Sequence, residues 1–148
     1  MIQEEFLKYI HENNTFATFL GVQVLEVKPG YAMGELKIQD HHKNAVGSVH
    51  GGCAFTLADT LGAVASSFGG TRMITLSGDF HFLSAAMDGS EKLIGKAREV
   101  KYGKKIQVYD LEISDDTGKL IAKGTFSYYN TGMPWEEVDG NMGESGQR

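Results

Sequence analysis

Hydrophobic positions recur with different spacings along this chain, and each change of spacing marks a predicted element. Residues 3–20 place apolar side chains at roughly helical intervals, which predicts a helix broken near Asn13-Asn14. Apolar runs at 22–27 and 33–38 flank the sequence Lys28-Pro29-Gly30. Because proline followed by glycine favours a tight turn, this segment predicts a β-hairpin.

The middle of the chain is predicted to be one long, buried helix. It follows the polar segment 39–50, which we expect to be a loop, and runs from Gly51 to about Phe68, where Gly69-Gly70 ends it. Residues 51–71 contain neither Lys nor Arg, and the helix is apolar on nearly all of its faces. A helix of this kind is buried in a core or in a subunit interface.

Four strands are predicted after the helix, at 73–83, 91–102, 105–114 and 119–129. Strict alternation in the first of them would place two sets of side chains on opposite faces. One set is Ile74, Leu76, Gly78, Phe80 and Phe82, and the other is Thr75, Ser77, Asp79 and His81.

One long helix against a large antiparallel sheet predicts an α+β fold with two layers. We expect a single domain over residues 1–130, in which 1–20 form an N-terminal helical segment. Residues 131–148 show no periodicity and are expected to be a disordered tail.

Composition narrows the class of protein further. The chain has 148 residues, a formal charge of −5 and 41% hydrophobic residues, as in an ordinary globular domain. Its single cysteine, Cys53, excludes an intramolecular disulfide and a Cys-based zinc cluster, and its histidines lack the spacing of metal ligands. The chain has no signal-peptide pattern and no run of about 18 apolar residues. We therefore expect a soluble, cytoplasmic protein that binds no metal, membrane or nucleic acid.

Asp59 is the candidate catalytic residue, because it is a carboxylate in the middle of the apolar helix. A buried carboxylate is costly unless it is partnered, and such residues often do chemistry. The alternative is a structural aspartate that is hydrogen-bonded to a loop or to another subunit. Gly62, three positions further on, leaves room beside Asp59 for a backbone or a ligand.

The start of the helix, His50-Gly51-Gly52, is the second candidate site. Unpaired backbone N–H groups and the positive end of the helix dipole can bind an anion or polarise a carbonyl oxygen there. Asp59 lies about 12 Å further along the axis, at about 1.5 Å per residue. At that separation, the helix start and Asp59 of a single chain cannot both contact one carbonyl group. If the two act together, they must come from two subunits.

The segment from Asn44 to Asp59, with Gly47 and His50-Gly51-Gly52 between them, resembles the signature of hotdog-fold acyl-CoA thioesterases. It resembles in particular the phenylacetic-acid-degradation thioesterase subfamily. The resemblance extends over roughly residues 15–130, through a strand that ends in Phe80-His81-Phe82-Leu83. It departs at Ser84-Ala85-Ala86, where many relatives have an Arg-Pro pair.

The resemblance implies a hotdog fold, in which the sheet wraps around the central helix, and homodimers or homotetramers with sites at the subunit interface. Asp59 would be the nucleophile or the general base that hydrolyses an acyl-CoA thioester to the acid and CoA, without a cofactor. The Gly51 N–H of the opposite subunit would hold the thioester oxygen. Asn44 and His50 would shape the loop and orient the carbonyl or the water, and Ser77 would help to place the water.

A basic segment, 91–105, stands out in this acidic chain, with six Lys or Arg and two Glu for a local charge of +4. Its residues Lys101, Lys104 and Lys105 form either a basic entrance for the phosphates of CoA or a solvated pair of strand ends. Together with Gly47 and Gly52, these lysines are the expected substrate-binding residues.

Two other functions stay open at this point: an acyl-CoA-binding protein without turnover, and an enoyl-thioester hydratase on the same fold. The first usually carries a fused DNA-binding segment and the second a His–carboxylate motif, and the sequence shows neither. Cys53 lies one turn from His50, but its apolar surroundings favour a packed thiol over a nucleophile. The sequence specifies no particular acyl group.

Overall fold

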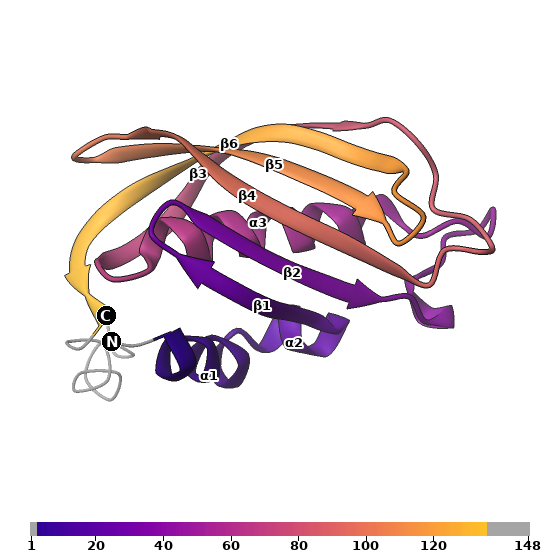
Figure 1. Ribbon diagram of the computed structural model, residues 1–148, viewed down its shortest axis with the longest axis horizontal. Helices are drawn as coiled ribbons and strands as arrows, with labels where there is room; N and C mark the ends of the chain where they lie inside the picture. Colours follow the sequence, from indigo (N-terminus) through magenta and orange to yellow (C-terminus); the bar gives the residue numbers. More distant parts are fainter. Residues whose placement is uncertain (1–2, 136–148) are drawn as a thin grey trace.

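The computed structural model describes residues 3–135, which form two short helices, a six-stranded antiparallel sheet and one long central helix (Figure 1). The helices are α1 (Gln3–Asn13), α2 (Thr15–Leu20), the short 3-10 turn η1 (Asp40–His42) and α3 (Gly51–Ser67). The strands are β1 (Val22–Lys28), β2 (Tyr31–Lys37), β3 (Thr71–Phe82), β4 (Lys92–Tyr102), β5 (Ile106–Asp115) and β6 (Leu120–Pro134). Their order across the sheet is β1-β2-β4-β5-β6-β3, so β1 and β3 are the edge strands.

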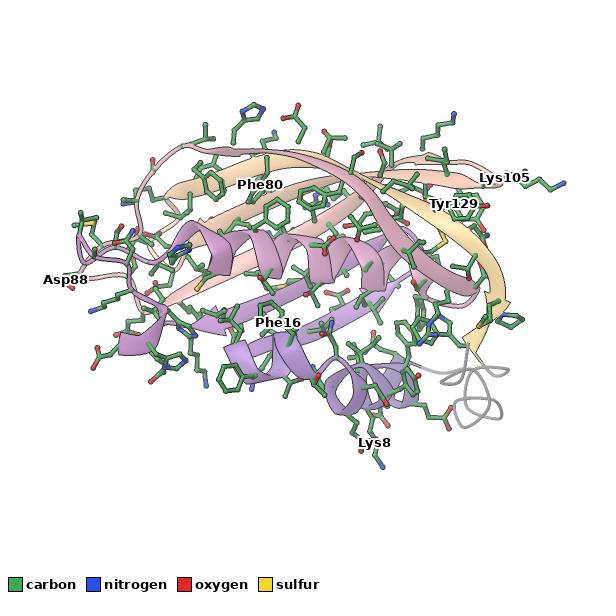
Figure 2. The ribbon with its side chains drawn as sticks, turned by 180° about the vertical axis from the view of Figure 1, so that it is seen from behind. Lys8, Phe16, Phe80, Asp88, Lys105 and Tyr129 are labelled. Atoms are coloured by element: carbon green, nitrogen blue, oxygen red, sulfur yellow. The ribbon has the colours of Figure 1, made fainter. Side chains whose placement is uncertain are left out.

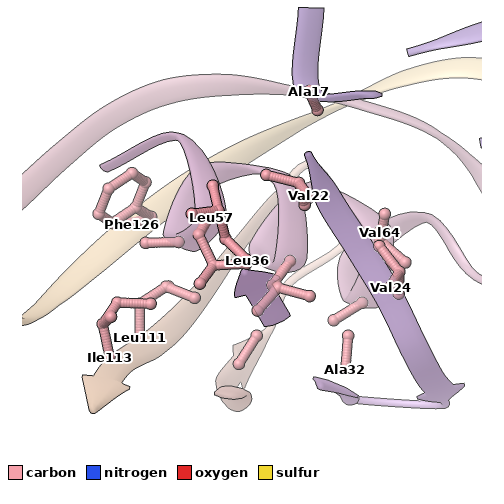
Figure 3. Close-up of a cluster of buried hydrophobic side chains, with 14 of the residues drawn as sticks. Ala17, Val22, Val24, Ala32, Leu36, Leu57, Val64, Leu111, Ile113 and Phe126 are labelled. Atoms are coloured by element: carbon pink, nitrogen blue, oxygen red, sulfur yellow. The ribbon is translucent and has the colours of Figure 1, made fainter. Parts of the chain in front are cut away.

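The sheet curves around α3, and the two together form the core (Figure 1). Leu57 and Leu61 of α3 are fully buried, as are Leu36 on β2 and Leu111 on β5. Figure 3 shows Leu57 lying between Leu36 and the side chains of β5 and β6. The predicted α+β arrangement, with the sheet wrapped around one long helix, is confirmed.

Two glycines let the helix pack closely on the sheet. Gly34 on β2 is paired directly with Gly95 on β4. A Cβ atom at either position would lie only 2.9 Å or 2.5 Å from the side chain of Leu61. The glycine pair therefore forms a shallow hollow for Leu61, which brings the backbone of α3 close to the middle of the sheet.

The break in the N-terminal helix falls where the sequence predicts it. Asn14 separates α1 from α2, and its side-chain oxygen accepts a hydrogen bond from the Ala17 N–H at 3.2 Å. Gly21 ends α2 with a φ of +99°, a left-handed conformation that favours glycine. No helix within residues 3–135 is long and apolar enough to cross a membrane.

Strand β6 is longer than the sequence pattern indicated. β6 continues to Pro134, which pairs with Thr71, so residues 131–134 belong to the sheet and not to a disordered tail. Trp135 then donates a hydrogen bond from Nε1 to the Ser67 carbonyl at 3.0 Å and packs edge-on against Phe6. The rest of the expected tail, 136–148, lies outside the described residues.

Strand β3 contains a β-bulge at Leu76 that the alternation pattern missed. Thr75 pairs with Tyr128 and Ser77 pairs with Ser127, which leaves Leu76 without a cross-strand partner. One extra residue reverses which side chains face the helix, because the side chains of a strand alternate with a period of two. The prediction that Thr75 and Ser77 share a face of this strand is therefore wrong.

Candidate active site

Asp59 projects from the middle of α3 toward β3 and β6, and two hydroxyl groups meet it there. Thr75 on β3 donates a hydrogen bond from Oγ1 to Asp59 Oδ1 at 2.7 Å. The Tyr128 hydroxyl on β6 donates to the Asp59 backbone carbonyl at 3.2 Å and lies 3.4 Å from the same Oδ1. Within residues 3–135, the second carboxylate oxygen, Oδ2, has no hydrogen-bond partner. One oxygen of this half-buried carboxylate is thus held in place, and the other has no partner among the described residues.

Gly62 provides the space that brings Tyr128 to Asp59. A Cβ atom at position 62 would overlap the hydroxyl oxygen of Tyr128. The Tyr128 side chain is fully buried, and burial, followed by the negative charge of Asp59, raises the pKa of its phenol above the ordinary value. The phenol therefore stays protonated and acts as a donor to Asp59. The expected room beside Asp59 exists, and a tyrosine hydroxyl occupies it.

Ser77, which was expected to help place the water, lies on the face of β3 opposite to that of Thr75. Its register partner is Ser127, which lies on the opposite face of β6 from the buried Phe126 and Tyr128. After the bulge, the side chain that turns toward α3 is Phe80, whose ring centroid lies 5.6 Å from that of Phe126 (Figure 2). Thr75 is the site residue that the pattern missed. The sequence does contain the Thr75 hydroxyl two positions before Ser77. Only the bulge between these two residues decides which of them faces Asp59.

The start of α3 leaves one backbone donor open. The His50 imidazole caps the helix, because its Nδ1 accepts a hydrogen bond from the Gly52 N–H at 2.8 Å. In the described part of the chain, the Gly51 N–H has no acceptor. A Cβ atom on Gly51 would lie 2.9 Å from the Phe82 ring, so the backbone and this ring are close together. The Gly52 N–H is thus used by the cap, whereas the Gly51 N–H has no acceptor among the described residues.

The loop before α3 is held by the side chain of Asn44. Its Oδ1 accepts hydrogen bonds from the Val46 and Ser48 N–H groups, both at 3.1 Å, and its Nδ2 donates to Ser48 Oγ at 2.8 Å. Gly47 adopts a φ of +84° at the tip of this loop. Asn44, His50 and Gly51 line one pocket of about 330 Å³. The structure thus brings this group of predicted residues together.

The lysines predicted to bind CoA lie at the other end of the folded chain from this pocket. Lys101 is the penultimate residue of β4, and Lys104 and Lys105 form the exposed turn before β5. Figure 1 shows this turn at the end of the molecule where α3 finishes, opposite Gly51, and Figure 2 shows Lys105 extending outward from it. A larger cavity of about 800 Å³ also lies at this end. Its lining residues include Arg98, Gln107 and Tyr109 but none of the predicted site residues.

Cys53 is a buried thiol in the first turns of α3. Its Sγ contacts the His42 carbonyl at 3.8 Å, and burial raises the pKa of the thiol. Because the thiolate is the nucleophilic form, this environment disfavours covalent catalysis by Cys53. These contacts agree with the prediction that Cys53 is a packed thiol and not a nucleophile.

Comparisons with known proteins match the chain over most of its length. The family model described as the thioesterase superfamily matches residues 46–122. A putative esterase of Archaeoglobus fulgidus is 35% identical over 133 residues, which cover 88% of this chain and 86% of the relative. Acyl-coenzyme A thioesterase PaaI of Escherichia coli is 30% identical over 113 residues, covering 76% of this chain and 80% of the relative.

Solved structures with the same fold include proteins of the same kind as the sequence relatives. The structure of E. coli PaaI, from the phenylacetic acid degradation operon, superposes with a TM-score of 0.83 at 27% identity, covering 88% of this chain and 94% of that one. A Streptococcus mutans protein bound to acetyl CoA superposes with a TM-score of 0.71 at 26% identity, covering 76% and 90%. The family match extends over more than half of the chain and includes both Gly51 and Asp59. This protein therefore belongs to the thioesterase superfamily and is a PaaI-like enzyme with the hotdog fold.

Proposed function

We propose that this chain is an acyl-CoA thioesterase, which hydrolyses the thioester of an acyl-CoA to a carboxylic acid and the free thiol of CoA. The observation that carries the proposal is the Asp59 carboxylate, with Oδ1 held by Thr75 and Oδ2 open. E. coli PaaI is named as an acyl-coenzyme A thioesterase, and the S. mutans protein of the same fold was solved with acetyl CoA. Both relatives support a CoA thioester as the substrate class.

The reaction requires a nucleophile at the thioester carbon and a donor at its oxygen. As a general base, Asp59 would take a proton from water while the water oxygen forms the new C–O bond. As a nucleophile, Asp59 Oδ2 would attack first, and water would then hydrolyse the resulting anhydride. In both routes the C–S bond breaks and the CoA sulfur leaves as a thiolate, which then takes up a proton. The Gly51 N–H would stabilise the negative charge that develops on the carbonyl oxygen.

A homodimer is the smallest assembly that completes such a site. Within one chain, Gly51 and Asp59 are separated by about 12 Å along α3. β3 is an edge strand of the sheet and exposes apolar side chains, with Ile74 50%, Leu76 52% and Phe82 58% accessible. A long apolar edge strand favours pairing with another chain. Pairing of two β3 strands would bring Gly51 of one protomer toward Asp59 of its partner, and a tetramer would hold two such dimers.

The same pairing gives the lysines a place in the site. In an antiparallel β3–β3 dimer, the start of α3 in one protomer lies beside the β4–β5 end of the other. Lys101, Lys104 and Lys105 would then flank the pocket at Gly51 from across the interface. Their charge would attract the phosphates of CoA to an otherwise acidic protein.

The test is thiol release from a panel of aromatic and aliphatic acyl-CoAs. Asp59→Asn should lower kcat roughly 100-fold or more, because it removes the catalytic carboxylate. Asp110→Asn is the matched control, since Asp110 also accepts a hydrogen bond from a threonine, Thr125 at 3.1 Å, but lies on the exposed face of β5. It should leave kcat unchanged.

Full activity of Asp59→Asn would overturn the assignment of the catalytic residue. CoA-ester binding without thiol release would instead identify a binding protein. Loss of enoyl-thioester absorbance without thiol release would identify a hydratase.

A further inference from the structure

We infer that Tyr128 is a positioning residue for Asp59, which fixes the orientation of the carboxylate so that Oδ2 faces the substrate. The inference rests on the proposed function, in which Asp59 is the catalytic carboxylate. Neither the family match nor the signature in residues 44–59 includes Tyr128, which lies on β6.

The contacts of the Tyr128 hydroxyl place it between the backbone and the side chain of Asp59. It lies 3.2 Å from the Asp59 carbonyl oxygen and 3.4 Å from Oδ1. Its single proton is therefore shared between two acceptors on the same residue, which ties the carboxylate to the backbone of α3. A carboxylate is the stronger acceptor of the two, so the hydroxyl also holds Oδ1 through this contact.

Tyr128 and Thr75 hold Asp59 from two neighbouring strands. Thr75 on β3 donates to Oδ1 at 2.7 Å, and Tyr128 on β6 approaches the same oxygen from its cross-strand position. A single donor would leave the carboxylate free to rotate about the bond between its Cβ and Cγ atoms. Two donors on Oδ1 restrict that rotation and leave Oδ2 as the oxygen that can meet water or the thioester carbon.

Tyr128 acts only through Asp59, because it has no access to a substrate. Its side chain is fully buried, its ring lies 6.1 Å from Tyr109 and 6.5 Å from Phe126, and its hydroxyl fills the space at Gly62. These neighbours fix the position of the ring. Removal of the hydroxyl alone should therefore leave the fold and the substrate pocket unchanged.

The experiment is Tyr128→Phe, assayed by thiol release with the best acyl-CoA from the panel. We expect kcat to fall about tenfold with KM unchanged, because one hydrogen bond to the reacting carboxylate is lost. Tyr109→Phe is the matched control, since it removes a buried phenol hydroxyl that bonds Gln107 at 3.3 Å. Its kcat should equal that of the wild type, and thermal unfolding should give similar Tm values for both variants.

A double-mutant cycle separates positioning from a structural role. In the Asp59→Asn background, Tyr128→Phe should change the residual rate by less than about twofold, because the charged acceptor is gone. An unchanged kcat in Tyr128→Phe, a rise in KM in its place, or the same loss in both backgrounds would overturn the inference. Failure of the proposed function would look different, because the wild type itself would then release no thiol.

Discussion

Gly51 and Gly62 show how the absence of a side chain shapes the site at the scale of single residues. Gly62 leaves room for the Tyr128 hydroxyl beside Asp59. Gly51 begins α3 against the Phe82 ring and has an N–H without an acceptor in the described residues. Gly62 therefore matters for the side chain that packs beside it, and Gly51 matters for its backbone donor.

Gly51→Pro should remove the donor while keeping the helix. Proline is well tolerated at the first position of a helix, and His50, with φ −58° and ψ +135°, has the extended conformation that a residue before proline prefers. We expect kcat to fall roughly 100- to 1,000-fold, as when one oxyanion donor is removed.

Gly51→Ala is the control for this substitution. It adds the same Cβ atom near Phe82 but retains the N–H, so it should keep most of the activity. Equal losses in the two variants would show that crowding, and not the missing donor, lowers the rate.

At the scale of elements, the β5–β6 hairpin is anchored by one buried carboxylate. Asp115 accepts hydrogen bonds from the Thr117 N–H at 2.9 Å, the Lys119 N–H at 3.0 Å and the Ser90 hydroxyl at 2.7 Å. Burial alone would raise the pKa of Asp115, but the hydrogen bonds outweigh it and hold the pKa at about 2. Ser90 belongs to the connection between β3 and β4, so Asp115 also ties that connection to the hairpin.

This anchor should make stability depend on acid pH. Because the folded pKa of Asp115 is lower than its unfolded value of 3.8, its contribution is present above about pH 4 and is lost as the pH falls toward 2. Asp115→Asn should lower the free energy of unfolding by roughly 1–3 kcal/mol at pH 7. The difference from the wild type should narrow between pH 4 and pH 2 in urea unfolding.

Asp88→Asn, at an exposed loop position, controls for the general effect of losing a carboxylate. It should unfold like the wild type at each pH. A gap between wild type and Asp115→Asn that stays constant from pH 7 to pH 2 would contradict this role of Asp115.

At the scale of the whole molecule, the proposal that Gly51 and Asp59 meet across a dimer interface can be tested by mixing two inactive variants. Asp59→Asn and Gly51→Pro dimers should each be nearly inactive. A heterodimer of the two variants has one site in which both residues are intact, so unfolding and refolding an equal mixture should restore up to about a quarter of wild-type activity. No recovery, in a mixture that size-exclusion chromatography shows to be dimeric, would place the site within one chain.

Much of this arrangement follows from local patterns in the sequence. The helix break at Asn14, the hairpin at Lys28-Pro29-Gly30 and the apolar helix from Gly51 are each set by a few neighbouring residues, and the structure confirms them. Asp59 and Gly51 also stand out by chemistry alone, because a carboxylate in an apolar helix and a glycine at a helix start are local features.

The partners of Asp59 were decided only by the tertiary structure. An extra residue at Leu76 changes the register of β3, so Thr75 and not Ser77 reaches the carboxylate, and nothing in the local pattern marks that bulge. Tyr128 reaches the same group from 69 residues away, because β6 lies next to β3 in the sheet and Gly62 leaves space for its hydroxyl. Spacing along the chain determines helices and turns, whereas contacts between distant strands depend on register and packing, which arise only when the whole sheet closes around the helix.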